Sequence, residues 1–461
     1  MRVGVYYRLD SAIGRLIDRP VSKLYRFGFL FSVKNHRPKE LPRDWKRQRV
    51  RGHYLYTHRE TTWRLIGDVL LVGTVIPLRG TVEEAASARL WDNLTGRFAA
   101  IVLDEKPYVV QDAFGAQTVF YRDKGKAIAS HAGLLAAAYG HSRNKVAADF
   151  IKTPEYKSRS VCYLPGLMTM HEGIKPLIPN HTYGLRSGEI TRIWPLKERR
   201  SSTFDEFFNE FTVLLDAMAT VDRPILGVTG GIDTRVLVAG LSSRNVPIRT
   251  VTWSPPRIDK KEIPIVENTV KVLGLNHVWL LHEADRADPI AVVSGQNSGG
   301  FRGGSRITAD TARLFSEGTF VRGYGGEIIR GFYNLRNRKM TGSNVGEMVE
   351  AYGSSMREKN PSAEYLRVVT EAFEEYSDIC DYSDLRGFNP NDVFYWEHRM
   401  GVWGACMHNE MDAAVYNMTG INSRPLFEVS YGLPDEERLT KHLLNRIVIS
   451  QVPAMADVKV V

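Results

Sequence analysis

Apolar and polar positions change their spacing near residue 200. Before it, short apolar runs alternate with Asp, Gly and Pro, which predicts strands joined by turns at 69–73, 98–103, 108–110, 118–121, 168–170 and 182–185. After a polar stretch, apolar residues recur at helical spacing, beginning with the stripe Phe204, Phe207, Phe208, Phe211, Leu214, Leu215 and Met218. We therefore expect a sheet-rich first half and a domain boundary near residues 196–203.

Beyond that boundary, strands and helices alternate. The pattern predicts strands at 225–228, 248–253, 278–281 and 319–322, with helices at 235–243, 263–273 and 308–316. This alternation is typical of βαβ units that build a parallel sheet. The C-terminal third is expected to be mainly helical, including residues 435–450. Two domains follow from these patterns, over 1–197 and 198–461.

Composition narrows the class of protein. Of the 461 residues, 43% are hydrophobic and 25% are charged, as in ordinary globular chains, so a disordered or collagen-like chain is excluded. Three widely spaced cysteines without a CxxC pair argue against structural zinc and against a disulfide framework. No stretch approaches 18 apolar residues, so we expect a cytoplasmic protein that does not enter a membrane.

The excess of positive charge is local. Net charge is +9, and residues 34–51 hold eight Lys and Arg against two acidic residues. Such a segment is suited to docking an acidic partner, for example a carrier, a leader peptide or a nucleic acid. A solvated basic loop explains the same composition, and the sequence leaves both interpretations open.

One segment has the composition of an anion-binding loop. The residues from Thr229 to Thr234 (TGGIDT) lie between an apolar strand and an apolar helix. Glycines let the backbone approach a phosphate, the helix N-terminus offers free N–H groups, and the threonines add hydroxyl donors. Asp233 fits beside bound phosphates if it holds Mg²⁺. An ordinary strand-to-helix turn capped by Asp233 is the structural alternative.

This loop resembles the SGGxDS loop of the asparagine synthetase family of ATP-dependent ligases. A second segment, Gly323 to Gly331 (GYGGEIIRG), resembles the family's GxGxDE segment, with Glu327 in place of the usual Asp. The resemblance implies that Asp233 and Glu327 hold Mg²⁺ on the phosphates of ATP. It also implies a nucleotide-binding set made of Thr229, Gly230, Gly231, Asp233, Thr234, Trp253, Gly323 and Gly325.

Tyr324 stands where asparagine synthetases have Glu, and the family's β-lactam-forming and carbapenam-forming synthetases have Tyr there. The resemblance implies that it forms a dyad with a downstream Glu that deprotonates the attacking amine. Glu358 is our candidate partner; Glu347, Glu350 and Glu364 are alternatives, and a packing or adenine-contacting role for Tyr324 stays open. Lys459, which follows Pro453, is the match for a lysine that stabilises the adenylate and pyrophosphate.

The first half resembles the family's glutaminase domain, through segments such as 94–99, 112–121 and 129–131. Glutamine-dependent members carry a nucleophilic Cys at position 2, but this chain has Arg2. The resemblance therefore implies a two-domain α/β protein. It further implies that a degenerate, glutaminase-like (Ntn-hydrolase-like) β-sandwich precedes an adenine nucleotide α-hydrolase-like (PP-loop) domain with a parallel sheet. No glutamine would be hydrolysed.

The function we expect is ATP-dependent formation of an amide bond, in which a substrate carboxylate is adenylated and an amine displaces AMP. The substrate would be a small molecule or peptide that bears a carboxylate and an amine, as for lasso-peptide cyclases, which also lack the cysteine. Two alternatives stay open: a catalytically silent scaffold or binding protein, and a PP-loop enzyme that modifies RNA. A homo-oligomer is compatible with the sequence.

Overall fold

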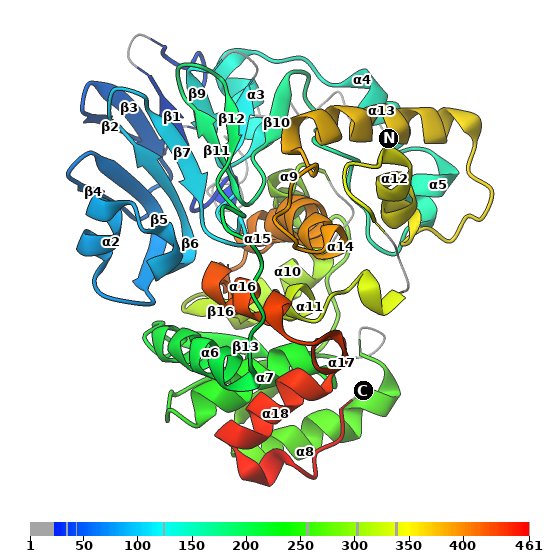
Figure 1. Ribbon diagram of the computed structural model, residues 1–461. Coiled ribbons are helices and arrows are strands. Elements are labelled where there is room, and N and C mark those ends of the chain that lie inside the picture. Colours follow the sequence, from blue (N-terminus) through cyan, green and yellow to red (C-terminus); the bar gives the residue numbers. More distant parts are fainter. Residues whose placement is uncertain are drawn as a thin grey trace.

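The computed structural model describes residues 23–33, 36–42, 44–122, 125–254, 258–300, 304–336 and 340–460. These residues form two stacked antiparallel sheets and a separate parallel sheet surrounded by helices (Figure 1). All strands of the antiparallel sheets lie before residue 193, and all strands of the parallel sheet lie after residue 223. The expectation of an α/β chain with both kinds of sheet is confirmed.

Each antiparallel sheet has six strands. The order of the first is β10-β8-β9-β1-β3-β2, and its strands are β1 (Phe29–Ser32), β2 (Lys46–Val50), β3 (His53–Thr57), β8 (Phe120–Arg122), β9 (Ala127–Ala129) and β10 (Ile174–Pro176). The order of the second is β12-β11-β7-β6-β5-β4, and its strands are β4 (Trp63–Ile66), β5 (Val69–Pro77), β6 (Leu94–Val102), β7 (Tyr108–Gln111), β11 (His181–Gly184) and β12 (Ile190–Arg192).

Alternating side chains explain the stacking. In β6, Ala99 and Ile101 enter the core that both sheets share, where they meet residues of the first sheet such as Phe31. Phe98 and Ala100 point to the opposite face, which is covered by helix α2 (Val82–Ala88). All nine residues of β6 are buried because both faces of the strand are covered. This central strand also contacts the second half of the molecule.

The parallel sheet has the order β15-β14-β13-β16-β17, with strands β13 (Pro224–Gly227), β14 (Arg249–Trp253), β15 (Asn276–Leu280), β16 (Thr319–Arg322) and β17 (Tyr416–Thr419). Every neighbouring pair runs parallel. The chain moves outward from β13 to β15 and then returns to the other side of β13 with β16. Ligands of such sheets bind where this order reverses, at the carboxyl ends of the strands.

Helices cover both halves. The first half contains α2, α3 (Ala132–Tyr139), α4 (Lys145–Phe150) and α5 (Pro154–Ser158). In the second half, α6 (Phe204–Met218) precedes the parallel sheet; α7 (Ile232–Ser242), α8 (Ile263–Leu273), α9 (Pro289–Asn297) and α10 (Ser305–Leu314) lie between strands β13 and β16, and α11 (Gly326–Ile329) follows β16. They are followed by α12 (Val345–Gly353), α13 (Ala363–Cys380), α14 (Pro390–Phe394), a π-helix (Tyr395–Gly404), α15 (Ala405–Met411), α16 (Arg424–Gly432), α17 (Asp435–Arg438) and α18 (His442–Gln451).

Two predicted elements are wrong. Residues 168–170 form no strand, because the Thr169 hydroxyl donates to the carbonyls of His171 and Ile174 and holds a local turn instead. The helix expected over 435–450 is broken into α17 and α18, and the Thr440 hydroxyl donates to the Glu437 carbonyl at the break. The pattern also missed β17, a short strand inside the helical C-terminal third. Within the described ranges, no helix is both long and apolar enough to cross a membrane.

Candidate functional site

The segment from Thr229 to Thr234, called the phosphate-binding loop after the role that the sequence predicts, connects β13 to the first turn of α7. Gly231 is the N-cap of α7 and has no side chain to occupy the N–H groups of the first turn. The hydroxyls of Thr229 and Thr234 lie 3.1 Å apart, and the Gly231 N–H donates to Thr229 Oγ1 at 3.2 Å. The Gly230 N–H donates to Glu262 Oε2 at 2.9 Å, so this loop already binds one anionic oxygen.

The second motif lies directly against this loop. A Cβ on Gly326 would lie 2.1 Å from Asp233 Oδ1, and one on Gly323 would lie 3.0 Å from the Thr234 nitrogen. Gly325 has a φ of 102°, and a Cβ there would lie 2.1 Å from the Ile421 carbonyl oxygen. The three glycines therefore allow the segment after β16 to pack between the loop after β13 and the end of β17.

Asp233 and Glu327 lie in one electrostatic environment, but neither carboxylate is free. Burial is the main cause that raises the pKa of Asp233; the charge of Glu327 raises it further, whereas Arg330 and Lys441 lower it. Both Asp233 oxygens accept hydrogen bonds from Arg330 Nη2, at 2.8 Å each. Glu327 Oε2 accepts a hydrogen bond from the Tyr395 hydroxyl.

These contacts bear on the expected Mg²⁺. The described residues contain no cluster of three or more His, Cys, Asp or Glu that could hold a metal ion. One or two carboxylates are enough when substrate phosphates supply the other ligands. Glu327 has the carboxylate that a Mg²⁺ ligand needs. Both Asp233 oxygens accept hydrogen bonds from Arg330, so Asp233 does not fit the role of a Mg²⁺ ligand in this arrangement. Mg²⁺ stays a prediction.

Tyr324 lies at the junction of the two halves. Its ring stacks on Phe114 of the first half, with ring centres 6.0 Å apart and planes 6° apart, and it contacts Trp403 and His408. Arg322 Nη1 donates to the Tyr324 hydroxyl at 2.7 Å. Because arginine has only donors, the phenol oxygen accepts this bond and its hydrogen remains available for a substrate acceptor.

The expected glutamate partner of Tyr324 does not lie beside it. Glu358 is exposed in the turn after α12, where its N–H donates to Ser158 of the first half and Oε1 accepts from its neighbour Asn360. Glu347 bonds Thr341, Glu364 pairs with Arg367, and Glu350 is exposed. Within the described part of the chain, Tyr324 hydrogen-bonds to Arg322 and to none of these glutamates. The arginine was not foreseen because nothing in the motif marks it.

The C-terminal segment that carries Lys459 is anchored. Val458 and Met455 are buried, and Arg235 Nη1, in the first turn of α7, donates to the Val458 carbonyl at 2.9 Å. The Lys459 side chain is exposed. Lys441, at the start of α18, is the lysine whose charge lowers the pKa of Asp233.

Trp253 lies at the carboxyl end of β14, next to the phosphate-binding loop. Its half-buried ring packs against Phe320, with ring centres 5.8 Å apart, and covers Gly227. This position at the carboxyl end of the sheet is compatible with a nucleotide contact. That role stays a prediction.

The buried π-helix supplies a further cation. Arg399 is 8% exposed and lies over the rings of Phe332, Tyr395 and Trp403, at 4.5, 5.8 and 5.7 Å. Glu397 pairs instead with Arg192 at 2.6 Å, away from the two motifs. π-Helical turns occur often at functional sites, since they reorient side chains. In this π-helix, Glu397 is used in a structural ion pair with Arg192, whereas Arg399 faces the second motif.

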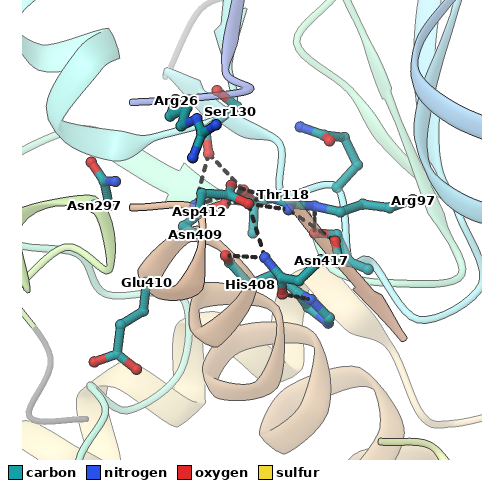
Figure 2. A network of polar contacts seen from close by, with 12 residues as sticks. Arg26, Arg97, Thr118, Ser130, Asn297, His408, Asn409, Glu410, Asp412 and Asn417 are labelled. Carbon is teal, nitrogen blue, oxygen red and sulfur yellow. Dashed lines mark hydrogen bonds and ion pairs between the residues drawn. The ribbon is translucent and has the colours of Figure 1, made fainter. Parts of the chain in front are cut away.

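A polar network joins the two halves (Figure 2). Arg97 of β6 forms a bidentate ion pair with Asp412, at 2.6 and 2.7 Å, and both side chains are buried. Arg97 Nη2 also donates to Asn409, whose amide donates to Thr118 at 2.9 Å. Nearby, Asn422 donates to Asp112 and accepts from the Phe114 N–H. Asn422 of the second half therefore holds the backbone of Phe114, whose ring stacks on Tyr324.

Met1 and Arg2, where glutamine-dependent relatives would carry the nucleophile, lie outside the described residues. Strand β1 begins at Phe29, and residues 23–28 precede it, so the first residue of this strand carries no free α-amino group. The three cysteines, all among the described residues, are buried and form no disulfide, and burial raises the pKa of Cys406 to about 12. A reactive thiolate is therefore not provided by Cys406 at neutral pH.

Part of the basic segment, residues 34–51, forms strand β2 at the edge of the first sheet. Of residues 34–51, positions 34, 35 and 43 lie outside the described residues. Strand β2 forms the edge of the first sheet, and the Arg47 and Arg49 side chains are exposed. The guanidinium groups of Arg37 and Arg47 each lie 5.6 Å from the centre of the Tyr54 ring. An acidic partner for this surface stays a proposal.

No protein-family model and no curated protein sequence matches the chain. Among solved structures, one match is described as NMN synthetase from Francisella tularensis; it covers 43% of this chain and 94% of that one, with 11% identity and a TM-score of 0.22. A likeness this distant carries no argument about function.

Proposed function

We propose that this protein is an ATP-dependent carbon–nitrogen ligase of the asparagine synthetase type that does not use glutamine. The observation that carries the proposal is the meeting of the two motif loops at the point where the order of the parallel sheet reverses. There Thr229, Asp233 and Glu327 lie around one helix N-terminus, with Tyr324 on the side of the first half.

In the proposed reaction, a carboxylate oxygen of the substrate attacks the α-phosphorus of ATP, and the bond to pyrophosphate breaks. An amine then attacks the acyl carbon of the adenylate, the acyl–oxygen bond to AMP breaks, and the nitrogen loses a proton. The phosphate-binding loop positions the triphosphate through its N–H groups and hydroxyls. The Tyr324 hydroxyl, oriented by Arg322, donates to the oxygen that becomes negative during the second attack.

The amine in this proposal belongs to the substrate itself or to a second molecule, because Arg2 offers no nucleophile for glutamine hydrolysis. The direct test is incubation with ATP and candidate substrates that carry both a carboxylate and an amine. AMP and pyrophosphate should form, rather than ADP and phosphate, together with an amide. Added glutamine should release no glutamate above buffer; such release would contradict this part of the proposal.

A catalytically silent scaffold is the second candidate, and one set of contacts favours it. The groups expected to face ATP already have protein partners: Glu262 at the Gly230 N–H, Arg330 at Asp233 and Tyr395 at Glu327. A silent protein would keep these contacts in the presence of ATP. ATP–pyrophosphate exchange separates the candidates, because a ligase must form the adenylate and release pyrophosphate, whereas a catalytically silent protein does not.

A further inference from the structure

Arg330 belongs to the second motif, and its side chain makes an unexpected contact with Asp233 of the first motif. It follows helix α11 directly, and its Nη2 atom donates to both oxygens of Asp233 at 2.8 Å. The side chain is 10% exposed, and its Nε is buried without a hydrogen-bond partner among the described residues. A buried N–H group without a partner is costly, so this guanidinium has donor capacity left at the site.

The surroundings of Arg330 suggest what its remaining donors bind. The phosphate-binding loop is adjacent, since the loop carries Asp233 and the second motif carries Glu327 only three residues before Arg330. A guanidinium is planar and presents its N–H groups in a fork that matches two phosphate oxygens. Its positive charge also neutralises Asp233, which would otherwise repel an incoming triphosphate.

We propose that Arg330, held in place by Asp233, binds the pyrophosphate portion of ATP directly and takes over the contact that a metal ion would make at this carboxylate. The inference rests on the proposed function. Asp233 acts as a positioning residue that orients the guanidinium, and Arg330 contacts the phosphates. Binding of the pyrophosphate then depends less on a divalent cation than the motifs alone imply, because Asp233, one of the two expected carboxylate ligands, binds Arg330 instead.

The test is calorimetric titration of the full-length protein with inorganic pyrophosphate, once in EDTA and once in MgCl₂. The wild-type protein should bind pyrophosphate in EDTA. Arg330→Met should weaken that binding by about tenfold or more, because a charge-assisted bond is lost. Arg330→Lys should fall between the two, since the charge remains and the fork is lost. Arg367→Met is the matched control and should bind as wild type does, because Arg367 lies exposed on α13.

Folding is checked by thermal unfolding of each variant. The Asp233 side chain is 26% exposed, so water can solvate it when Arg330 is replaced, and Arg330→Lys retains a cation if Arg330→Met unfolds. The proposal is overturned if wild-type protein binds pyrophosphate only with Mg²⁺, or if Arg330→Met binds equally well in EDTA. Tighter binding by Arg330→Met in MgCl₂ would overturn it too, because Arg330 would then compete with the metal.

The same experiment separates this inference from the proposed function. Mg²⁺-dependent binding of pyrophosphate by the wild-type protein, together with ATP–pyrophosphate exchange, would reject the arginine contact and leave the ligase intact. Absence of pyrophosphate binding in both EDTA and MgCl₂ would reject both, since a ligase of this type must hold the pyrophosphate that it releases.

Discussion

Tyr324 shows how a single contact changes the role of a residue. A glutamate beside the phenol would draw a proton away from it, as in a general base, but the neighbour is Arg322, which only donates. The phenol hydrogen is not used in this bond and is available to an acceptor on a substrate. We therefore propose that Tyr324 stabilises the acyl oxygen during attack by the amine and takes no part in adenylation.

Removal of only the hydroxyl tests this assignment. In Tyr324→Phe the ring still stacks on Phe114, so ATP–pyrophosphate exchange should stay near normal while amide formation falls by roughly 100-fold or more. Tyr54→Phe, at a half-buried position of β3 in the first sheet, is the matched control and should change neither step. Equal loss of both steps would indicate a role in substrate binding instead, and loss of neither would make Tyr324 a packing residue.

Part of the site could be predicted at the residue scale and part could not. Asp233, Glu327 and Tyr324 lie in short contiguous motifs, so their types and spacing can be read from the sequence. Arg330 could not be assigned, because its partner Asp233 lies 97 positions away and the contact exists only once both loops meet. The sequence left Glu358 open among four glutamates as the partner of Tyr324, and the fold places Glu358 in an exposed loop.

At the scale of elements, the π-helix over Tyr395–Gly404 buries a histidine in its neutral form. His398 is fully buried and stacks on Phe394, with ring planes 8° apart. Burial, with a smaller effect from the charge of Arg159, lowers the pKa of His398 to about 3. The unfolded chain therefore binds a proton at a higher pH than the folded protein does, so acid favours unfolding.

His398→Phe should remove this contribution. Between pH 6 and pH 4, His398 should lower the free energy of unfolding of the wild-type protein by about 1.4 kcal/mol for each unit of falling pH. The variant should show a slope that is smaller by that amount, measured by urea unfolding at several pH values. The comparison isolates His398 from other buried histidines such as His131. Parallel slopes would mean that the folded protein accepts a proton at His398.

The edge strand β2 carries the proposal of an acidic partner. Lys46, Arg47 and Arg49 are exposed, and replacing all three by Gln should weaken binding of a poly-glutamate probe and reduce the dependence of that binding on salt. Replacing the exposed Lys106, Lys145 and Lys152 by Gln removes the same charge elsewhere and serves as the control. Equal affinities of the two triple variants would show that only net charge matters.

At the scale of the whole molecule, the two halves depend on the buried pair of Arg97 and Asp412. Arg97→Met leaves the Asp412 charge buried without its partner, which should lower the free energy of unfolding by about 3–5 kcal/mol. The double variant Arg97→Met with Asp412→Leu should recover part of this loss, because no isolated charge remains. Arg367→Met should change stability by less than about 0.5 kcal/mol. A double variant as unstable as Arg97→Met alone would contradict this reasoning.

The sequence predicts the two kinds of sheet, but it does not predict the contacts between the two halves of the molecule. Alternating apolar runs indicated a sheet-rich first half, and βαβ spacing indicated the parallel sheet, because both depend on neighbours in the sequence. The order of the strands, the fifth strand β17 and the pairing of Arg97 with Asp412 depend on contacts between distant segments. Arg97 lies within an apolar strand, where the pattern alone does not indicate that its partner is 315 positions away.

The measurement that tests the central claim most directly is ATP–pyrophosphate exchange with a panel of carboxylic acids that also bear an amine, using wild-type protein, Asp233→Ala and Asp222→Ala. We expect exchange that depends on one class of acid in the wild-type protein and at least about a 100-fold loss in Asp233→Ala. Asp222→Ala should retain exchange, because Asp222 is exposed and lies before β13. Full exchange in a folded Asp233→Ala protein would contradict the assignment of the phosphate-binding loop, and with it the ligase.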